Sequence, residues 1–225
     1  MTDILEVIKS RRNVTQFLPK FVSWENISRV LDAGRHAPSC GNIQNWKFIV
    51  VLKPEMKQEI AAASYDQYEI AAAFALIVVC AEPEKAERYY GEKGKTFYSV
   101  QNCAAAAQNM LLEAHALGLG TRWVGAFDEA KVKELLKIPE EVEAHTIIAL
   151  GYAKDVPAKP PKYPLETLVY FGAWRAKIAD PAKYLNDIAT VLARKAHSTA
   201  EAIKKGQEYV VEKVKEVVGK REQEK

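Results

Sequence analysis

The sequence predicts a folded protein of mixed class, in which helices cover a sheet whose strands are buried on both faces. Two stretches, "WKFIVVL" (46–52) and "FALIVVCA" (74–81), are short, rich in β-branched residues and almost wholly apolar. This pattern is typical of strands that are covered on both sides. The chain has 225 residues, of which 48% are hydrophobic and 27% charged. A chain of that size and composition can bury a full core.

Three helices are predicted around these first strands. Apolar residues recur at helical spacing in 2–12, and "NVTQFLP" then ends the helix. Ser23 can cap a second helix, which runs to the Ala37–Pro38 boundary. Between the two strands, "PEMKQEIAAAS" predicts a helix with Pro54 in its first turn.

The centre of the chain predicts a long helix followed by a further strand. From Phe97 to Leu117 runs an alanine-rich stretch whose small side chains would let another helix approach closely, as in the centre of a subunit or of a dimer. Gly118 then indicates a helix C-cap. It does not fit a dinucleotide fingerprint, which requires the strand before the helix. A helix at about 128–136 leads into another buried strand, "HTIIALGYA" (145–153).

The composition changes after Gly151. Four prolines among residues 156–165 predict an extended, irregular connector. Residues 198–219 return to a helical pattern with valines near a heptad spacing among Lys and Glu. A helix that packs on a partner subunit, or a short coiled coil, fits this pattern better than a membrane anchor.

Composition also limits the class of partner. A net charge of +3, with cations and anions evenly mixed, does not predict a nucleic-acid surface. The three cysteines include no CxxC pair, and no leader or apolar run of roughly 20 residues is present, so we expect a cytoplasmic protein without disulfides or membrane attachment. No metal site is expected, because the histidines are isolated in the sequence: His36, His115, His145 and His197.

Two sets of residues remain as candidates for chemistry. Cys40, in "APSCGNIQNW" (37–46), is either a nucleophile or a small packing group, and the absence of a histidine nearby in sequence favours packing. Arg11, Arg12 and Asn13 stand at a predicted helix exit. They either cap the helix toward solvent or bind a phosphate, for which arginine pairs offer bidentate donors.

Four motifs in order resemble the FMN-dependent nitroreductase family. The first three are "RRNVTQF" (11–17), "APSCGNIQNW" (37–46) and "QNMLLEAHALGLGTRWVGAF" (108–127). The fourth is a basic residue two places before Pro-Leu-Glu, after a Leu-Gly-Tyr strand end, in "LGYAKDVPAKPPKYPLETLV" (150–169). The order of the four motifs is more specific than any one of them.

The resemblance implies an α+β, three-layer fold with a central mixed, mostly antiparallel sheet flanked by helices. It also implies a homodimer that binds two flavins at its interface and exchanges a C-terminal extension. On this basis residues 1–172 form the FMN-binding domain and residues 173–225 a helical extension.

The resemblance also assigns cofactor-binding roles by position. Arg11, Arg12 and Asn13 look like the residues that hold the FMN phosphate and ribityl chain, with Lys162 as a second phosphate-binding base. A second group of positions looks like the loop that each subunit presents to its partner's flavin: Ser39 and Cys40, supported by Asn42 and Gln44. A third group matches the strand end beside the isoalloxazine ring, where a backbone N–H commonly faces flavin N5: Trp123, Val124 and Gly125.

Two positions depart from the family pattern. Thr15 stands where the family has a third basic residue, a loss of charge that Lys159 could offset. Asn45 replaces the proline before Trp46, which predicts a looser turn.

The implied function is transfer of a hydride from NADH or NADPH, through flavin N5, to a nitroaromatic, quinone or flavin acceptor by a ping-pong mechanism. Because the flavin carries this chemistry, no catalytic side chain is expected. Two alternatives stay open. The first is a specialised member of the fold that performs oxygen-dependent flavin fragmentation, reductive dehalogenation or oxidation of peptide heterocycles. Such members differ mainly in the lid region, here residues 65–68 and 89–98, whose tyrosines could stack on an acceptor or pack in the core. The second is a flavin-binding protein without catalysis.

Overall fold

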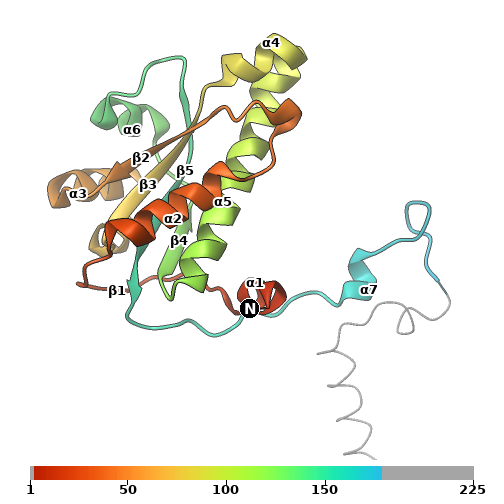
Figure 1. The fold of residues 1–225 in the computed structure, drawn as a ribbon, viewed down its shortest axis with the longest axis horizontal. Coiled ribbons are helices and arrows are strands. Elements are labelled where there is room, and N and C mark those ends of the chain that lie inside the picture. Colours follow the sequence, from red (N-terminus) through yellow and green to blue (C-terminus); the bar gives the residue numbers. More distant parts are fainter. Residues whose placement is uncertain (1–2, 179–225) are drawn as a thin grey trace, which may run out of the picture. The chain divides into compact units, whose positions relative to one another are not determined.

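The computed structural model describes residues 3–178 of the chain, and Figure 1 shows its elements in order. The chain divides into two compact units, the first ending at Lys159 and the second beginning at Pro160. From the N-terminus, the helices, helical turns and strands are α1 (Ile4–Ser10), β1 (Phe17–Leu18), α2 (Trp24–Arg35), η1 (Cys40–Asn42), β2 (Trp46–Val51), α3 (Pro54–Ala63), η2 (Tyr68–Ala72), β3 (Ala75–Ala81), α4 (Pro83–Lys93), η3 (Gly94–Tyr98), α5 (Ser99–Ala116), β4 (Gly120–Val124), α6 (Glu129–Leu136), β5 (Glu143–Ala153) and α7 (Leu165–Leu168).

The first unit is built on a five-stranded sheet in which β5 is central. The strand order is β1-β5-β3-β2, and β4 also pairs with β5. Every ladder between these strands is antiparallel, and one isolated parallel bridge joins Asn13 to Thr121. The expected α+β class with a mostly antiparallel sheet is therefore confirmed.

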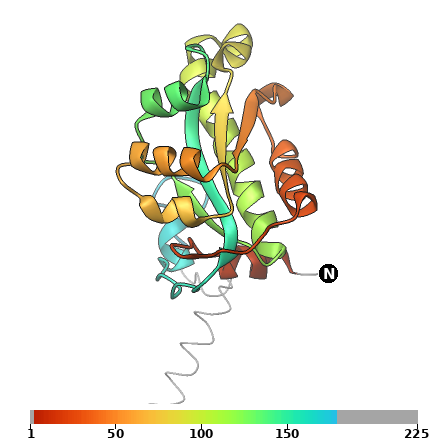
Figure 2. The same cartoon turned by 90° about the vertical axis from the view of Figure 1, so that its left-hand side faces the viewer.

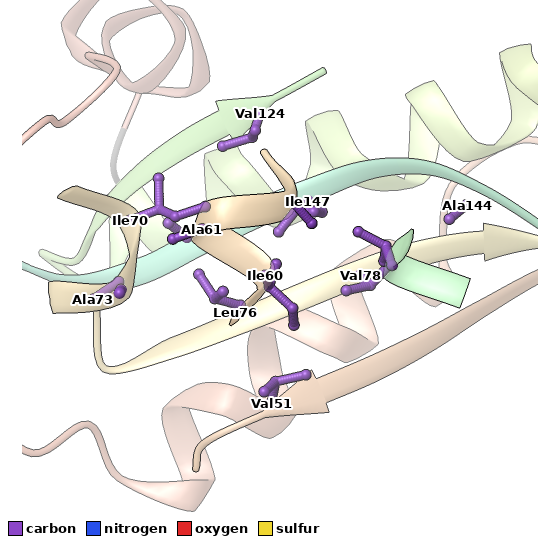
Figure 3. Packing of buried hydrophobic residues seen from close by; sticks show 14 of the residues in the cluster. Val51, Ile60, Ala61, Ile70, Ala73, Leu76, Val78, Val124, Ala144 and Ile147 are labelled. Carbon is purple, nitrogen blue, oxygen red and sulfur yellow. The ribbon is translucent and has the colours of Figure 1, made fainter. Parts of the chain in front are cut away.

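The sheet has a separate hydrophobic core on each face. All seven residues of β3 are buried, and because side chains alternate along a strand they divide between the two cores. One core contains Leu76 and Val78 together with Ile60 of α3, which Figure 3 labels. Cys80 and Val132 of α6 belong to the same core.

The other core packs α2 and α5 against the opposite face, with Ile77, Val79 and Met110 among its members. Figure 2 shows the resulting three layers, with the sheet between the two pairs of helices. The two helices approach closely where Gly34 of α2 faces Met110 of α5, because a Cβ on Gly34 would lie 2.3 Å from the Met110 Cε.

Local sequence signals set the ends of several helices, as predicted. The Ser23 side chain accepts a hydrogen bond from the Asn26 N–H, and Pro54 occupies the first turn of α3. Gly118, at φ +75°, follows the end of α5. Its N–H donates to the His115 carbonyl and the Leu119 N–H to the Ala114 carbonyl, which is the Schellman arrangement.

The segment before α5 differs from the prediction. The long helix starts at Ser99 instead of Phe97, because Gly94–Tyr98 form a π-helical turn that follows α4. Neither α4 nor the two-residue strand β1 is predicted by apolar periodicity. Gly91 breaks the regular conformation within α4 at φ +58° and ψ −152°. The helix predicted over 198–219 lies outside the described residues.

The second unit begins in the proline-rich connector. As expected, no helix or strand forms from Lys154 to Pro164, and α7 begins at Leu165. After α7 the Phe171 N–H donates to the Ala176 carbonyl, and the Tyr170 and Trp174 rings meet edge to face. None of the helices between residues 3 and 178 has both the length and the hydrophobicity to cross a bilayer.

Candidate functional site

Two arginines at the C-terminal end of α1 form the first part of the candidate site. The Arg12 Nη1 donates to three carbonyl oxygens, those of Lys9, Ser10 and Arg11, at 2.8–2.9 Å. The Arg12 Nε is buried and has no hydrogen-bond partner. Within the first unit, neither Arg11 nor Arg12 forms an ion pair with a carboxylate. Their charge is therefore uncompensated within the first unit. Both arginines are half-buried, so this charge is also partly shielded from solvent.

Burial first, and the positive charge of the arginines second, shift the ionisation of groups at this site. Burial, and next the charge of Arg12, lower the pKa of Arg11. Burial, then Arg11 and Arg12, lower the pKa of His115, whose Nε2 lies 2.7 Å from the Ser10 Oγ. A site that disfavours additional positive charge is electrostatically suited to an anion.

Asn13 joins the arginines to β4. The Val14 N–H donates to the Thr121 carbonyl at 2.8 Å, and the Trp123 N–H donates to the Asn13 Oδ1 at 2.8 Å. Two segments that lie 110 residues apart in sequence therefore adjoin. Thr15 is exposed on the same N-terminal segment.

The backbone of β4 leaves fewer groups for a flavin than the resemblance implies. The Trp123 N–H is already bonded to Asn13, so it does not face an open position. Val124 is buried, and its carbonyl accepts from the Thr146 hydroxyl at 2.9 Å. Gly125 is exposed just beyond the end of the strand, where a Cβ would touch only the Trp123 side chain, at 3.4 Å.

The loop containing η1 forms the second part of the candidate site. The Ser39 Oγ accepts from the Gln44 N–H at 3.1 Å, and the Gln44 amide donates to the Asn42 Oδ1 at 2.9 Å. Gly41, Asn42 and Gln44 all have φ between +51° and +56°. These conformations are uncommon for residues other than glycine, so the side-chain hydrogen bonds hold the loop in a shape that its backbone would rarely adopt.

A buried amide network anchors the same loop to α5. The Asn102 Oδ1 accepts from the Cys40 N–H at 2.9 Å, and its Nδ2 donates to the Asn45 Oδ1 at 2.8 Å. The Asn45 Nδ2 donates in turn to the Ser99 Oγ and to the Glu82 carbonyl. The expectation that Asn45 loosens this turn is wrong, because its fully buried side chain makes three hydrogen bonds.

Asn102 was not predicted from the sequence as part of the site. The feature of the sequence that could have indicated Asn102 is a polar amide within an alanine-rich helix, on the face of the helix that is buried. The network also bears on Cys40. In the described part of the chain no imidazole contacts its thiol, which accepts a hydrogen bond from the Asn102 Nδ2 at 3.3 Å. This arrangement favours a packing and positioning role for Cys40 over a nucleophilic one.

The two parts of the site lie at opposite ends of α5 in a single chain, as Figure 1 shows for α1 and the loop before β2. Asn102 marks one end and His115 the other, a separation of roughly 20 Å at 1.5 Å per residue. Lys162 is exposed in the second unit, and its approach to the arginines stays a prediction.

The fold defined by these features is that of the nitroreductases. A solved nitroreductase structure from Bacteroides thetaiotaomicron, provisionally named an NADH dehydrogenase/NAD(P)H nitroreductase, matches with a TM-score of 0.68 and 28% identity, over 77% of this chain and 99% of that one. The Nitroreductase family model matches residues 8–73 and 66–152.

Two curated relatives agree with this assignment. A protein of Archaeoglobus fulgidus with the same provisional name is 36% identical over 159 residues, which cover 69% of this chain and 88% of the relative. The FMN reductase (NADPH) of Bacillus subtilis is 24% identical over 80% of this chain and 78% of its own. The chain belongs to the nitroreductase family and is an oxidoreductase of that class, which confirms the resemblance indicated by its four motifs.

Proposed function

We propose that the chain is an FMN-dependent oxidoreductase that uses NADH or NADPH to reduce a small organic acceptor, such as a nitroaromatic, a quinone or a flavin. Donor and acceptor react in turn at the same site. The family membership and the name of the Bacillus subtilis relative, an FMN reductase, support this assignment.

The observation that carries the proposal is the arginine pair beside β4. Arg11 and Arg12 lack a carboxylate partner within the first unit, and the Arg12 Nε is buried with no acceptor. A phosphate group would supply both the missing negative charge and the missing acceptor. The residues present therefore fit the FMN phosphate, even though Thr15 adds no charge. Lys162, or Lys159 as a substitute, is proposed as the further base.

The remaining residues position the cofactor. Asn13 fixes the distance between the arginines and β4, and the exposed Gly125 lies just beyond the end of that strand. Bound FMN supplies two-electron hydride-transfer chemistry, so the protein has to bind, orient and shield it.

We place the loop from Ser39 to Gln44 against the flavin of a second copy of the chain. The loop and the arginines are separated by the length of α5, so one chain does not bring them together. Two chains packed with their α5 helices antiparallel would set the loop of each beside the arginines of the other. The proposed active form is thus a homodimer with two composite sites, as the resemblance implies.

Titration of the full-length protein with FMN, followed by flavin fluorescence, tests the phosphate clamp. Arg12→Ala should raise the Kd for FMN by about tenfold to a hundredfold, since a charge-assisted hydrogen bond contributes about 1.5–3 kcal/mol. Arg35→Ala, at an exposed site on α2, is the control and should leave the Kd unchanged. An unaltered Kd for FMN in both Arg11→Ala and Arg12→Ala would show that the two arginines do not bind the FMN phosphate.

Oxidation of NADH and NADPH by the FMN-loaded protein, with benzoquinone as the acceptor, tests catalysis. We expect rapid turnover with at least one of the two nucleotides. Slow flavin reduction by both, in protein shown to hold FMN, would leave a flavin-binding protein without the oxidoreductase activity.

A further inference from the structure

The geometry points to a substrate subsite for an aromatic molecule that carries an anionic group, in the groove between η1 and α4. We propose that Arg88 binds the anionic group and that Tyr89 stacks on the aromatic ring. This inference rests on the proposed function, because it identifies a substrate class for the site to which the η1 loop belongs.

The groove has a volume of about 540 Å³, within the range of small-molecule sites. The loop forms one wall with Gly41, Asn42 and Ile43, and α4 forms the other with Lys85, Arg88, Tyr89 and Tyr90. The two walls are in close contact at one point, because a Cβ on Gly41 would lie 2.7 Å from the Tyr90 hydroxyl oxygen. A ligand in the groove would therefore touch the loop that we place at the flavin.

The charges of the groove favour an anion. Lys85 shares the single carboxylate of Glu82 with Lys47, so these three residues retain one positive charge. Arg88 adds a second, since it forms no ion pair or side-chain hydrogen bond with any residue of the first unit. The acids of α4 are Glu84, Glu87 and Glu92, and none of them lines the groove. Glu87 is paired with Lys95, and neither Glu84 nor Glu92 forms an ion pair with Arg88. A free guanidinium in a concave site is a bidentate donor for a carboxylate or phosphate.

The tyrosines supply a flat surface beside the cation. Tyr90 is held in place by an edge-to-face contact with Tyr98, with ring centroids 5.2 Å apart. Tyr89 is 76% exposed and makes no ring contact within the first unit, so its face is available for stacking. An aromatic ring that bears an acid would meet both surfaces at once. Such a molecule could be an aromatic acid acceptor or the adenosine phosphate part of the nucleotide donor.

Calorimetric titration of the full-length protein with matched probes tests the subsite and distinguishes these two sources. The acceptor arm compares 4-nitrobenzoate with nitrobenzene, and the donor arm compares adenosine 2′-phosphate with adenosine. In at least one arm the anionic probe should bind more tightly than its neutral counterpart. Arg88→Ala should weaken the anionic probe about tenfold or more and leave the neutral probe unchanged.

Two further variants separate charge from stacking. Arg88→Lys should retain part of the preference for the anion, and Tyr89→Ala should weaken both members of the responding pair. Arg35→Ala is the matched control outside the groove, and thermal melting checks that each variant is folded. Equal affinity for anionic and neutral probes, an Arg88→Ala variant identical to the wild type, or no binding of any probe would overturn the proposal.

These titrations do not depend on flavin reduction, so the two proposals can fail separately. If the protein binds no FMN but anion binding still requires Arg88, the proposed function is wrong and the subsite stands. If FMN is bound and reduced while Arg88→Ala changes neither probe, the subsite is wrong and the proposed function stands.

Discussion

Asn45 and Asn102 are the amides that hold the η1 loop, and both are almost completely buried. Burying an amide is unfavourable unless its donors and acceptors are paired, and here Asn102 pairs with Asn45 on one side and with the Cys40 N–H on the other. The network therefore fixes the position of Cys40 relative to α5. Sequence patterns do not reveal such pairing, because Asn45 and Asn102 are 57 residues apart.

Replacing Asn102 with alanine tests this network at the residue scale. The change leaves the Cys40 N–H and the Asn45 Oδ1 without their partner, at a cost of about 1–3 kcal/mol for each buried group. Urea denaturation should show a loss of unfolding free energy of about 2–6 kcal/mol, the sum for the two groups, whereas Gln101→Ala, at the exposed neighbouring position, should change it little. Equal stability of the two variants would argue against the network.

His145 predicts a dependence of stability on pH. Burial lowers its pKa in the folded state, more than Glu143 and Glu129 raise it. A lowered folded-state pKa means that the unfolded chain binds the proton more readily, so stability decreases as the pH falls below the unfolded value of about 6.5. The unfolding free energy, measured between pH 8 and pH 5, should show this decrease.

The contribution of His145 to that decrease can be isolated with His145→Gln, which removes the titrating group. The variant should lose less stability than the wild type over the same pH interval. His115, whose pKa is also lowered, accounts for part of the remaining slope. A His145→Gln variant with the wild-type slope would contradict this assignment.

At the scale of elements, the π-helical turn between α4 and α5 depends on close backbone contact. Gly94 has ordinary helical dihedral angles, so alanine would suit its conformation. A Cβ there would nevertheless lie 2.3 Å from the Ala86 carbonyl oxygen and 2.6 Å from the carbonyl carbon. Backbone atoms within a helix cannot move aside as a flexible side chain can, so the turn has to shift.

Gly94→Ala should therefore lower the unfolding free energy by about 1–3 kcal/mol, the usual cost of overpacking. Gly125→Ala is a suitable stability control, since its Cβ would contact only the Trp123 side chain, at 3.4 Å. Chemical denaturation of both variants makes the comparison. If Gly94→Ala is as stable as the control, the turn is not held by this contact.

The elements that sequence reasoning predicted are those with strong local signals. The strands β2 and β3, the Ser23 cap and the Gly118 C-cap are all confirmed. Burial on both faces holds for β3 but not for β2, which lies at the edge of the sheet and is half-buried at Phe48, Ile49 and Val50. The helical segment from Pro83 to Thr96 was missed because its Lys, Glu and Gly residues give no apolar stripe. The strand β1 has two residues, too few to show any period.

At the scale of the whole molecule, motif order predicted which segments form the candidate site, and the fold brings Arg11–Asn13 beside β4 as the motifs require. The sequence could not show that Trp123 already donates its N–H to Asn13, because that bond depends on how two distant segments meet. Nor could it show that the η1 loop and the arginines lie at opposite ends of α5.

That separation makes the composite site the central claim, and a heterodimer of two defective chains tests it most directly. One chain carries Arg12→Ala, which removes a phosphate ligand. The other carries Ser39→Trp, which would block the flavin of its partner. Each homodimer alone should bind FMN poorly.

The heterodimer, isolated through two different affinity tags, has one site with both defects and one site with neither if the loop acts across the interface. We therefore predict that it binds about one FMN per dimer, with wild-type affinity. A heterodimer that binds no FMN, with both chains folded, would mean that each chain supplies its own loop and arginines and would contradict the composite site.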